Sequence, residues 1–183
     1  MFSLQELKRM RKQLGMTQAV LAKKAGVSQS LIAKIESGRI DPAFTKARKL
    51  YDVLTSVHVA QEPKAAAVMS TRIISAQHSD SVRECARTME KFKISQLPVF
   101  HGTALAGLLS ESAIVELIAA EKDLSELRAG DAMEEAPPLV PQSTPLRIVA
   151  ELLTHAPLVV VTSQGAPQGV ITKADLLKTV YQR

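Results

Sequence analysis

The chain has 183 residues, 46% of them hydrophobic, which is typical of one or two folded domains and excludes a disordered chain. Its single cysteine excludes an internal disulfide, and its four histidines are too far apart in sequence for a metal-ligand cluster. No apolar run reaches the roughly 18 residues of a membrane span, and the first residues lack the apolar core of a signal peptide. We therefore expect a cytoplasmic protein that requires no metal, no cofactor and no membrane.

The net charge of +5 is unevenly distributed along the chain. Residues 1–58 contain 11 Lys and Arg against 4 Asp and Glu, a net charge of +7, whereas residues 59–183 contain 12 against 14, a net charge of −2. A basic segment joined to a mildly acidic body favours one domain that neutralises phosphates and another with a different task. A basic surface that only keeps the protein soluble is the alternative.

Three short helices are predicted before residue 40. Apolar residues recur at helical spacing from Leu4 to Leu14, and Thr17 and Ser28 are suitable caps for a second and a third helix. Each helix is followed by a glycine that can take the left-handed conformation common at helix ends, namely Gly15, Gly26 and Gly38. The two short helices after residue 16 thus flank a tight glycine turn.

A fourth helix is predicted from Asp41-Pro42 onward, because proline at the first helical position loses nothing by lacking its N–H. Its expected buried stripe consists of Phe44, Ala47, Leu50 and Leu54. The helical period is lost after Thr55, and Gln61-Glu62-Pro63 is expected to break any continuing helix. We therefore predict a helical domain over residues 1–58 and a linker over 59–64.

The order of residues between the second and third helices is more specific than amphipathic helices, which a plain helical bundle would also have. Thr17-Gln18-x-x-Leu21-Ala22-x-x-Ala25-Gly26-Val27-Ser28-x-x-x-Ile32-x-x-Ile35-Glu36-x-Gly38 resembles the helix-turn-helix of phage repressor and Cro-like regulators, the Xre family, and the resemblance extends over residues 4–55. It implies an all-α, lambda-repressor-like fold. It also implies that Ser28 to Ile35 is a recognition helix in the DNA major groove.

This resemblance gives a role to seven polar residues. The positions that read base edges hold Gln29, Ser30 and Lys34. The positions that contact phosphates hold Gln18, Ser28, Ser37 and Arg39. Glutamine suits adenine and lysine suits guanine. For each residue an ordinary solvated helix face is the alternative, and for Ser30, whose reach is short, that alternative is equally good.

The second part of the chain repeats itself. Ser79-Asp80-Ser81-Val82 aligns with Ser143-Thr144-Pro145-Leu146, and Gly107-Leu108-Leu109-Ser110 aligns with Gly169-Val170-Ile171-Thr172 after a slight shortening of the second copy. Each copy is predicted to be β-α-β-β-α. The predicted first strands are Ile73-Ile74 and Leu139-Val140, and the helices that follow them cover residues 81–92 and 145–153.

Residues 65–183 resemble a tandem pair of CBS repeats. The resemblance lies in Val68-Met69-Ser70, Leu97-Pro98-Val99 and Gly169-Val170-Ile171-Thr172-x-x-Asp175. It implies an α/β pair of repeats, at 65–122 and 123–183, that pack strand face to strand face. The whole chain is thus predicted to be a multi-domain protein with a helix-turn-helix head and a CBS pair.

In CBS pairs an adenosine-type ligand occupies a cleft between the repeats. The resemblance implies that Thr172 meets phosphate or ribose, that Asp175 accepts from ribose hydroxyls and that Lys173 adds a charge for phosphate. Alternatively, Thr172 and Asp175 only cap the last helix. The first repeat keeps a hydroxyl at Ser110 but has Ala113 in place of the aspartate, so we expect one ligand per pair.

The regulatory ligand implied is an adenine nucleotide (AMP, ADP or ATP) or S-adenosylmethionine. Few cationic residues lie near either motif in the sequence, which argues against tight binding of a triphosphate. No nucleophile setting, phosphate-cradling glycine loop or pair of carboxylates indicates an enzyme.

We therefore predict a transcription regulator that binds a double-stranded DNA operator as a homodimer through its CBS pairs. One alternative is a constitutive DNA binder whose CBS pair only dimerises. A second is a nucleotide-sensing regulatory subunit of an enzyme. RNA binding is less favoured, because the recognition helix does not fit the narrow major groove of RNA.

Overall fold

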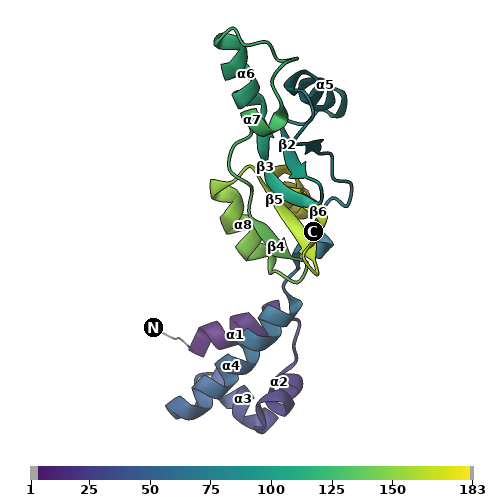
Figure 1. Cartoon of the computed structure of the whole chain (residues 1–183). Coiled ribbons are helices and arrows are strands. Elements are labelled where there is room, and N and C mark those ends of the chain that lie inside the picture. The colour runs from purple at the N-terminus through teal and green to yellow at the C-terminus, as the bar shows by residue number, and fades with distance from the viewer. Residues whose placement is uncertain (1–3, 182–183) are drawn as a thin grey trace. The chain divides into compact units, whose positions relative to one another are not determined.

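A computed structural model describes residues 4–181 and divides into two compact units, with the boundary between Glu62 and Pro63. The first unit is entirely helical, and the second combines helices with two small sheets (Figure 1). Within residues 4–181, no helix is both long enough and apolar enough to cross a membrane.

The helical unit consists of α1 (Leu4–Gln13), α2 (Gln18–Ala25), α3 (Gln29–Glu36) and α4 (Phe44–Gln61). The predicted caps are confirmed: the Thr17 hydroxyl accepts from the Val20 N–H and the Ser28 hydroxyl from the Leu31 N–H, at 3.2 Å each. The predicted glycines are also confirmed, because all three have a positive φ: Gly15, Gly26 and Gly38. Local signals in the sequence thus fix both ends of the turn between α2 and α3.

The core of the helical unit lies between α4 and the three shorter helices. Its most buried large side chains include Leu21, Ile32, Ile35, Leu50 and Leu54. The prediction that Phe44 belongs to this core is wrong, because its side chain is 77% exposed. An α-helix turns about 100° per residue, so Phe44 lies about 120° around the helix from Leu50 and outside the buried face.

Helix α4 begins later and ends later than predicted. Pro42 precedes the helix, whose cap position is Ala43, and the helix continues without a break to Gln61. The predicted linker at 59–64 is therefore helical over its first half. Val57 continues the inward-facing stripe of α4, which explains why the helix does not stop near Thr55.

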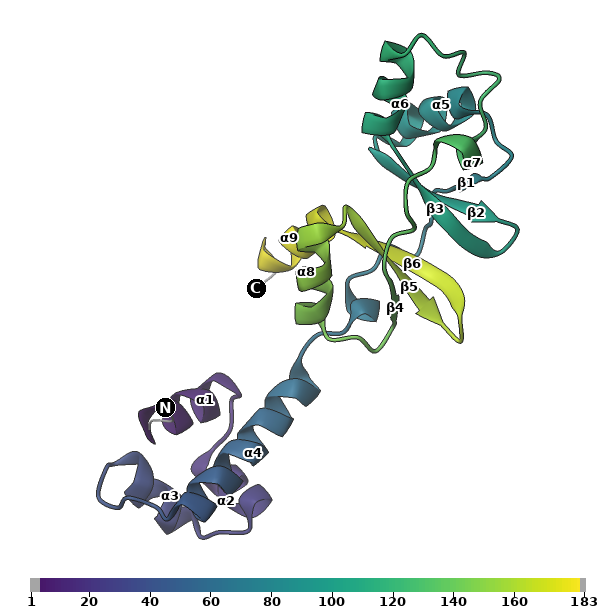
Figure 2. The same ribbon diagram turned by 60° about the vertical axis from the view of Figure 1, so that its left-hand side comes forward.

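The second unit contains two repeats of the predicted order β-α-β-β-α (Figure 2). The first consists of β1 (Ala76–Gln77), α5 (Val82–Phe92), β2 (Gln96–His101), β3 (Ala104–Ser110) and α6 (Glu111–Ala119). The second consists of β4 (Leu139–Pro141), α8 (Leu146–His155), β5 (Leu158–Ser163), β6 (Ala166–Thr172) and α9 (Lys173–Tyr181). Each sheet has a parallel first pair and an antiparallel second pair, in the orders β1-β2-β3 and β4-β5-β6.

The first strand of the first repeat is not where the sequence predicted it. The strand β1 comprises Ala76 and Gln77, which pair with Val99 and Phe100, whereas Ile73 and Ile74 lie before it. Ile74 is partly buried against the core of the first repeat. Its apolar side chain therefore packs on the core, although its backbone is not part of a strand.

The leading segment of each repeat packs on the other repeat. A short 3-10 turn, η1 (Ala65–Ala67), and a short helix, α7 (Ala129–Ala132), belong to these segments. Ala65 lies in the core of the second repeat, and Ala129 lies in the core of the first. Ser70 pairs with Val170 in β6, and Glu134 pairs in the same way with Leu108 in β3.

Each leading segment crosses a strand of the other repeat, at Ser70 over β6 and at Glu134 over β3, and a glycine makes room for each crossing. A Cβ at Gly169 would lie 2.5 Å from the Ser70 carbonyl oxygen, and a Cβ at Gly107 would lie 2.7 Å from that of Glu134. Between the repeats, apolar residues of β3 and β5 form a shared buried cluster of Leu108, Leu158 and Val160. The two repeats therefore pack through their strands, as the sequence predicted.

Candidate functional site

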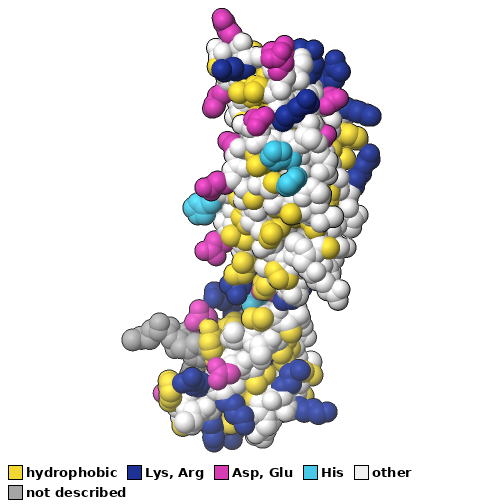
Figure 3. Space-filling model, in the orientation of Figure 1, with side chains coloured by type: hydrophobic (Ala, Val, Ile, Leu, Met, Phe, Trp, Pro, Cys, Tyr) yellow, Lys and Arg dark blue, Asp and Glu magenta, His cyan; other side chains and the backbone are white. Residues whose placement is uncertain are grey.

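The predicted base-reading residues lie together on the exposed face of α3. The side chains of Gln29, Ser30 and Lys34 are all exposed. Of the predicted phosphate contacts, Gln18 is partly buried, and three are exposed: Ser28, Ser37 and Arg39. The visible face of the helical unit carries more Lys and Arg than Asp and Glu (Figure 3), consistent with the net charge of +7 over residues 1–58.

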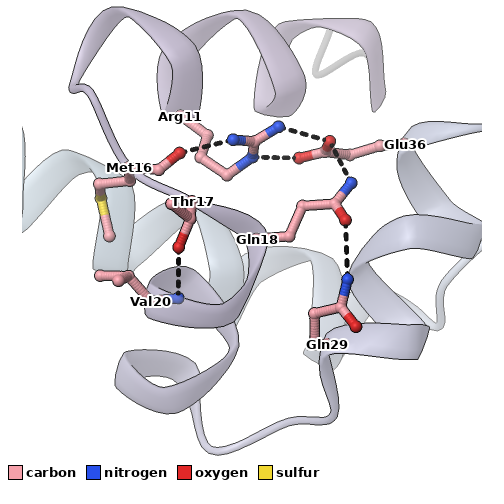
Figure 4. A network of polar contacts seen from close by, with 7 residues as sticks. All are labelled: Arg11, Met16, Thr17, Gln18, Val20, Gln29 and Glu36. Carbon is pink, nitrogen blue, oxygen red and sulfur yellow. Dashed lines mark hydrogen bonds and ion pairs between the residues drawn. The ribbon is translucent and has the colours of Figure 1, made fainter.

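Beneath this surface a buried ion pair joins α1 to α3 (Figure 4). The Arg11 guanidinium donates to both carboxylate oxygens of Glu36, at 2.6 and 2.8 Å, and also to the Met16 carbonyl. The two side chains are only 9% and 4% exposed. The bidentate geometry satisfies the charges of both groups inside the fold.

Two glutamines extend this network to the surface. The Gln18 Nε2 donates to Glu36 at 3.0 Å, and the Gln29 Nε2 donates to the Gln18 Oε1 at 3.0 Å. A carboxylate only accepts hydrogen bonds, so the side-chain NH2 group of Gln18 must face Glu36. The side-chain oxygen of Gln18 then faces Gln29. The Gln29 side chain is thereby left with its oxygen and one N–H for an outside partner.

The sequence placed Glu36 in the motif but gave neither Glu36 nor Arg11 a function. Burial would raise the pKa of Glu36, but hydrogen bonds from Arg11 and Gln18, together with the Arg11 charge, more than offset it. The pKa of Glu36 is therefore lower than usual, and the carboxylate stays ionised. The network holds a charged group under the surface and orients Gln29 above it.

The second candidate site is a cleft of about 700 Å³ between the two repeats. It brings together three of the predicted ligand-binding residues, Thr172, Lys173 and Asp175. The backbone N–H and the hydroxyl of Thr172 both donate to Oδ2 of Asp175, at 3.0 and 2.8 Å. The Lys178 ammonium donates to Oδ1 at 2.9 Å.

These contacts hold Asp175 ionised. Burial would raise its pKa, but hydrogen bonds from Lys178 and from the backbone and hydroxyl of Thr172 lower it below the usual value. Because a carboxylate offers about four acceptor positions, the three contacts leave capacity for a further donor. Asp175 can therefore bond the Thr172 N–H at the start of α9 and still accept a hydrogen bond from a ligand.

Ser110, the fourth predicted residue, is not among the residues that line this cleft. It is the cap of α6, and its hydroxyl accepts from the Ala113 N–H at 3.1 Å. The position that matches Asp175 is Ala113 itself, so this repeat offers no carboxylate at the corresponding place.

The structure corrects the expectation that few cations surround the ligand motif. Arg72, Lys93 and Lys178 line the same cleft as Lys173. Arg72 and Lys93 are remote from Thr172 in sequence. The crossing at Ser70 brings Arg72 to the second repeat, and the strand packing brings the end of α5 there.

A second cleft of about 480 Å³ is lined by residues of α8 and by the segment before β4. Its ionisable lining residues are Glu135, Glu151 and His155, and the described residues around it include no lysine or arginine. The two clefts therefore differ in the sign of their charge.

Comparison with known families matches both units. Residues 7–58 match the helix-turn-helix family, and residues 65–120 and 129–182 each match the CBS domain family. The chain belongs to the CBS-domain family. Its two repeats are therefore a CBS pair, and its helical unit is a helix-turn-helix domain, which confirms the predicted fold class.

One curated relative, an uncharacterized 33.4 kDa protein in the ribosomal RNA operon of Thermofilum pendens, is 25% identical over 133 residues. The match covers 66% of this chain and 44% of the relative, so this chain spans less than half of that protein's length.

Solved structures resemble the CBS pair of this chain. The CBS-pair protein CBSX2 from Arabidopsis thaliana has a TM-score of 0.59 at 22% identity, covering 67% of this chain and 96% of that one. A CBSX2 structure in complex with AMP has a TM-score of 0.57 at 23% identity, covering 65% and 96%. The CBS domain pair of protein MJ0100, in complex with 5′-methylthioadenosine and S-adenosyl-L-methionine, has a TM-score of 0.58 at 19% identity, covering 66% and 98%. These likenesses establish the fold of the CBS pair.

Proposed function

We propose that this protein is a sequence-specific DNA-binding transcription regulator whose CBS pair senses an adenosine-type ligand. The observation that carries the proposal is the exposed polar face of α3, which the Arg11–Glu36 ion pair supports from inside the helix-turn-helix domain. Residues 1–58, which contain this face, carry a net charge of +7. A rigid helix with polar side chains pointing outward is the element that such domains insert into the major groove.

On DNA, Gln29 would read a base edge. Its free oxygen and N–H match the donor and acceptor that adenine presents in the major groove. Lys34, five residues further along α3, would donate to guanine, and Ser30, whose side chain is shorter, would make a closer contact with the DNA. Gln18, Ser28, Ser37 and Arg39 would contact phosphates, which fix the position of the domain without reading sequence.

In the CBS pair, the ligand would bind in the cleft that contains Thr172 and Asp175. Both repeats line this cleft, because Phe92 and Ile94 come from the first and Val170 from the second. A ligand there contacts both repeats and favours one packing of the pair over another. The AMP complex and the methylthioadenosine and S-adenosylmethionine complex of similar CBS pairs support an adenosine compound as the ligand.

Regulation would require two copies of the chain. A single helix-turn-helix domain covers one half-site, and tight operator binding needs two domains about one helical turn of DNA apart. We propose a homodimer formed through the CBS pairs, in which the bound ligand sets the spacing of the two DNA-binding domains. Coupling of this kind changes affinity by roughly 5- to 150-fold.

The test is a titration of the full-length protein on an operator selected from random duplexes, with and without each adenosine compound at fixed salt. A ligand-dependent change in operator affinity that Asp175→Ala removes is the expected result. Operator binding that no ligand alters would leave a constitutive DNA binder. Absence of any preference over random duplexes would overturn the DNA-binding part and favour a regulatory subunit of an enzyme.

A further inference from the structure

We propose that the cleft between the CBS repeats selects adenosine carrying two or three phosphates over adenosine compounds that are neutral or cationic. The inference rests on the proposed ligand-sensing function and names the chemical class of its ligand. Four cationic side chains line the cleft against one carboxylate: Arg72, Lys93, Lys173 and Lys178 against Asp175.

Two of the four cations have no partner inside the protein. Lys178 is paired with Asp175 at 2.9 Å, and the Arg72 guanidinium lies over the Phe92 ring, 5.0 Å from its centre. Within residues 4–181, Lys93 and Lys173 form neither an ion pair nor a side-chain hydrogen bond. They approach the cleft from opposite repeats, at the end of α5 and the start of α9. Charges left unpaired around one cavity attract an anion that lies between them.

The backbone at Lys93 supports this use of its ammonium group. Lys93 follows the last residue of α5 in the left-handed conformation, with φ 53° and ψ 48°. Glycine adopts this conformation freely and usually occupies this position, whereas other L-residues adopt it rarely. Glycine would end the helix without strain but would bring no charge to the cleft.

The remaining lining suits the rest of an adenine nucleotide. Ile94, Pro98 and Leu158 give the cleft an apolar wall for a base, and Asp175 keeps acceptor capacity for ribose hydroxyls. A diphosphate or triphosphate would then extend toward Lys93 and Lys173. S-adenosylmethionine carries a sulfonium and an ammonium against one carboxylate, so its net positive charge opposes that of the cleft.

The second cleft would not take such a ligand. Its ionisable lining is Glu135, Glu151 and His155, and carboxylates that line a cleft repel phosphate. The inference therefore includes a stoichiometry of one nucleotide per chain.

The test is calorimetry of the full-length protein with adenosine, AMP, ADP, ATP and S-adenosylmethionine at constant ionic strength. We expect affinity to rise with the number of phosphates, so that ATP binds at least about tenfold more tightly than adenosine, which corresponds to one charge-assisted contact. S-adenosylmethionine should bind no more tightly than adenosine.

Two variants separate the charge from the fold. Lys93→Gly removes the ammonium and relieves the backbone, so it should be at least as stable as the parent while losing about fivefold in ATP affinity, in line with a partly exposed ion pair. Lys173→Gln should lose a similar factor, and both should keep the parent affinity for adenosine. Lys122→Gln, an exposed lysine outside the residues that line the cleft, is the matched control and should change nothing.

The outcomes distinguish this inference from the proposed function. Equal affinities for adenosine and ATP, or tighter binding of S-adenosylmethionine than of ATP, would overturn the phosphate selectivity and leave adenosine sensing intact. Binding of none of the five compounds would overturn both. Loss of ATP affinity in Lys122→Gln equal to that in Lys93→Gly would show that net charge, and not the cleft, causes the effect.

Discussion

The two units of this protein position their functional side chains in different ways. In the helix-turn-helix domain, Gln29, Ser30 and Lys34 follow one another along α3, and the Arg11–Glu36 ion pair supports them from below. In the CBS pair, the cleft collects residues from widely separated segments and depends on a backbone crossing at Gly169. The side chains of the first site therefore come from a single helix, whereas those of the second are brought together by topology.

If the two sites are independent, a substitution in the buried ion pair that supports α3 should lower the stability of the helix-turn-helix domain only. Glu36→Gln leaves Arg11 buried without its counter-charge, and breaking a buried pair in this way costs about 3–5 kcal/mol of folding free energy. Urea unfolding followed by circular dichroism should show the transition of the helical unit at lower denaturant and that of the CBS pair unmoved. Asp52→Asn, which removes an exposed ion pair with Arg48, is the control and should shift the transition by less than about 0.5 kcal/mol. A shift in both transitions would contradict independence.

The same ion pair predicts how the helical unit responds to acid. The pKa of Glu36 is lowered on folding, so its contribution is complete above the usual glutamate pKa of about 4.3 and is lost as the pH falls through the folded value. Unfolding measured between pH 7 and pH 3 should show this loss in the parent and a weaker pH dependence in Glu36→Gln. Equal slopes in the two proteins would rule out Glu36 as the source.

The dependence of the cleft on topology is tested at Gly169. A Cβ there meets the Ser70 carbonyl at 2.5 Å, and the two backbone hydrogen bonds between Ser70 and Val170 hold the strands together. We expect Gly169→Ala to destabilise the CBS pair by about 3 kcal/mol, the upper part of the range for overpacking, and to weaken ATP binding. Gln168→Ala, at an exposed neighbouring position, is the control. Unchanged stability in Gly169→Ala would show that the crossing can shift at little cost.

This contrast also explains what the sequence could predict. Thr17, Gly26 and Ser28 act through contacts within a few residues, so the turn between α2 and α3 was predictable from local pattern. Phe44 was wrongly included in the buried stripe of α4, because its spacing from Leu50 already places it about 120° around the helix and on the exposed side. The repeat gave the order of strands and helices in the CBS pair.

The full set of residues that line the cleft could not be predicted from the sequence, because it depends on how the two repeats pack. Thr172 and Asp175 belong to one short motif and were assigned from sequence, whereas Arg72 and Lys93 carry no motif that links them to it. Their place follows from the packing of one repeat against the other. The support of Gln29 by Gln18 and Glu36 was likewise visible only as geometry, although all three belong to the predicted motif.

A smaller effect is expected at Gln29, and it sharpens the description of the α3 site as local. Gln29→Ala should lose about 1–3 kcal/mol of discrimination between the preferred base and other bases at one operator position. Its affinity for duplexes that already carry another base at that position should stay the same. Competition between operator variants at fixed salt measures this change. Gln18→Ala should reduce the same discrimination in part, because it releases the Gln29 amide. Gln13→Ala, exposed at the end of α1, should not. An unaltered preference in Gln29→Ala would remove its base-reading role.

The smallest effect is expected at Arg39, which distinguishes contacts that position the domain from those that read bases. Arg39 is exposed just beyond α3, and a phosphate contact there contributes equally on every sequence. Arg39→Ala should therefore weaken binding by about 1 kcal/mol or less on the operator and on random duplexes alike, and it should lower the dependence of log affinity on log salt by about one unit per chain. Salt titrations on both kinds of duplex measure the two slopes. If the loss were confined to the operator, Arg39 would read sequence, and the base-contacting surface would extend beyond α3.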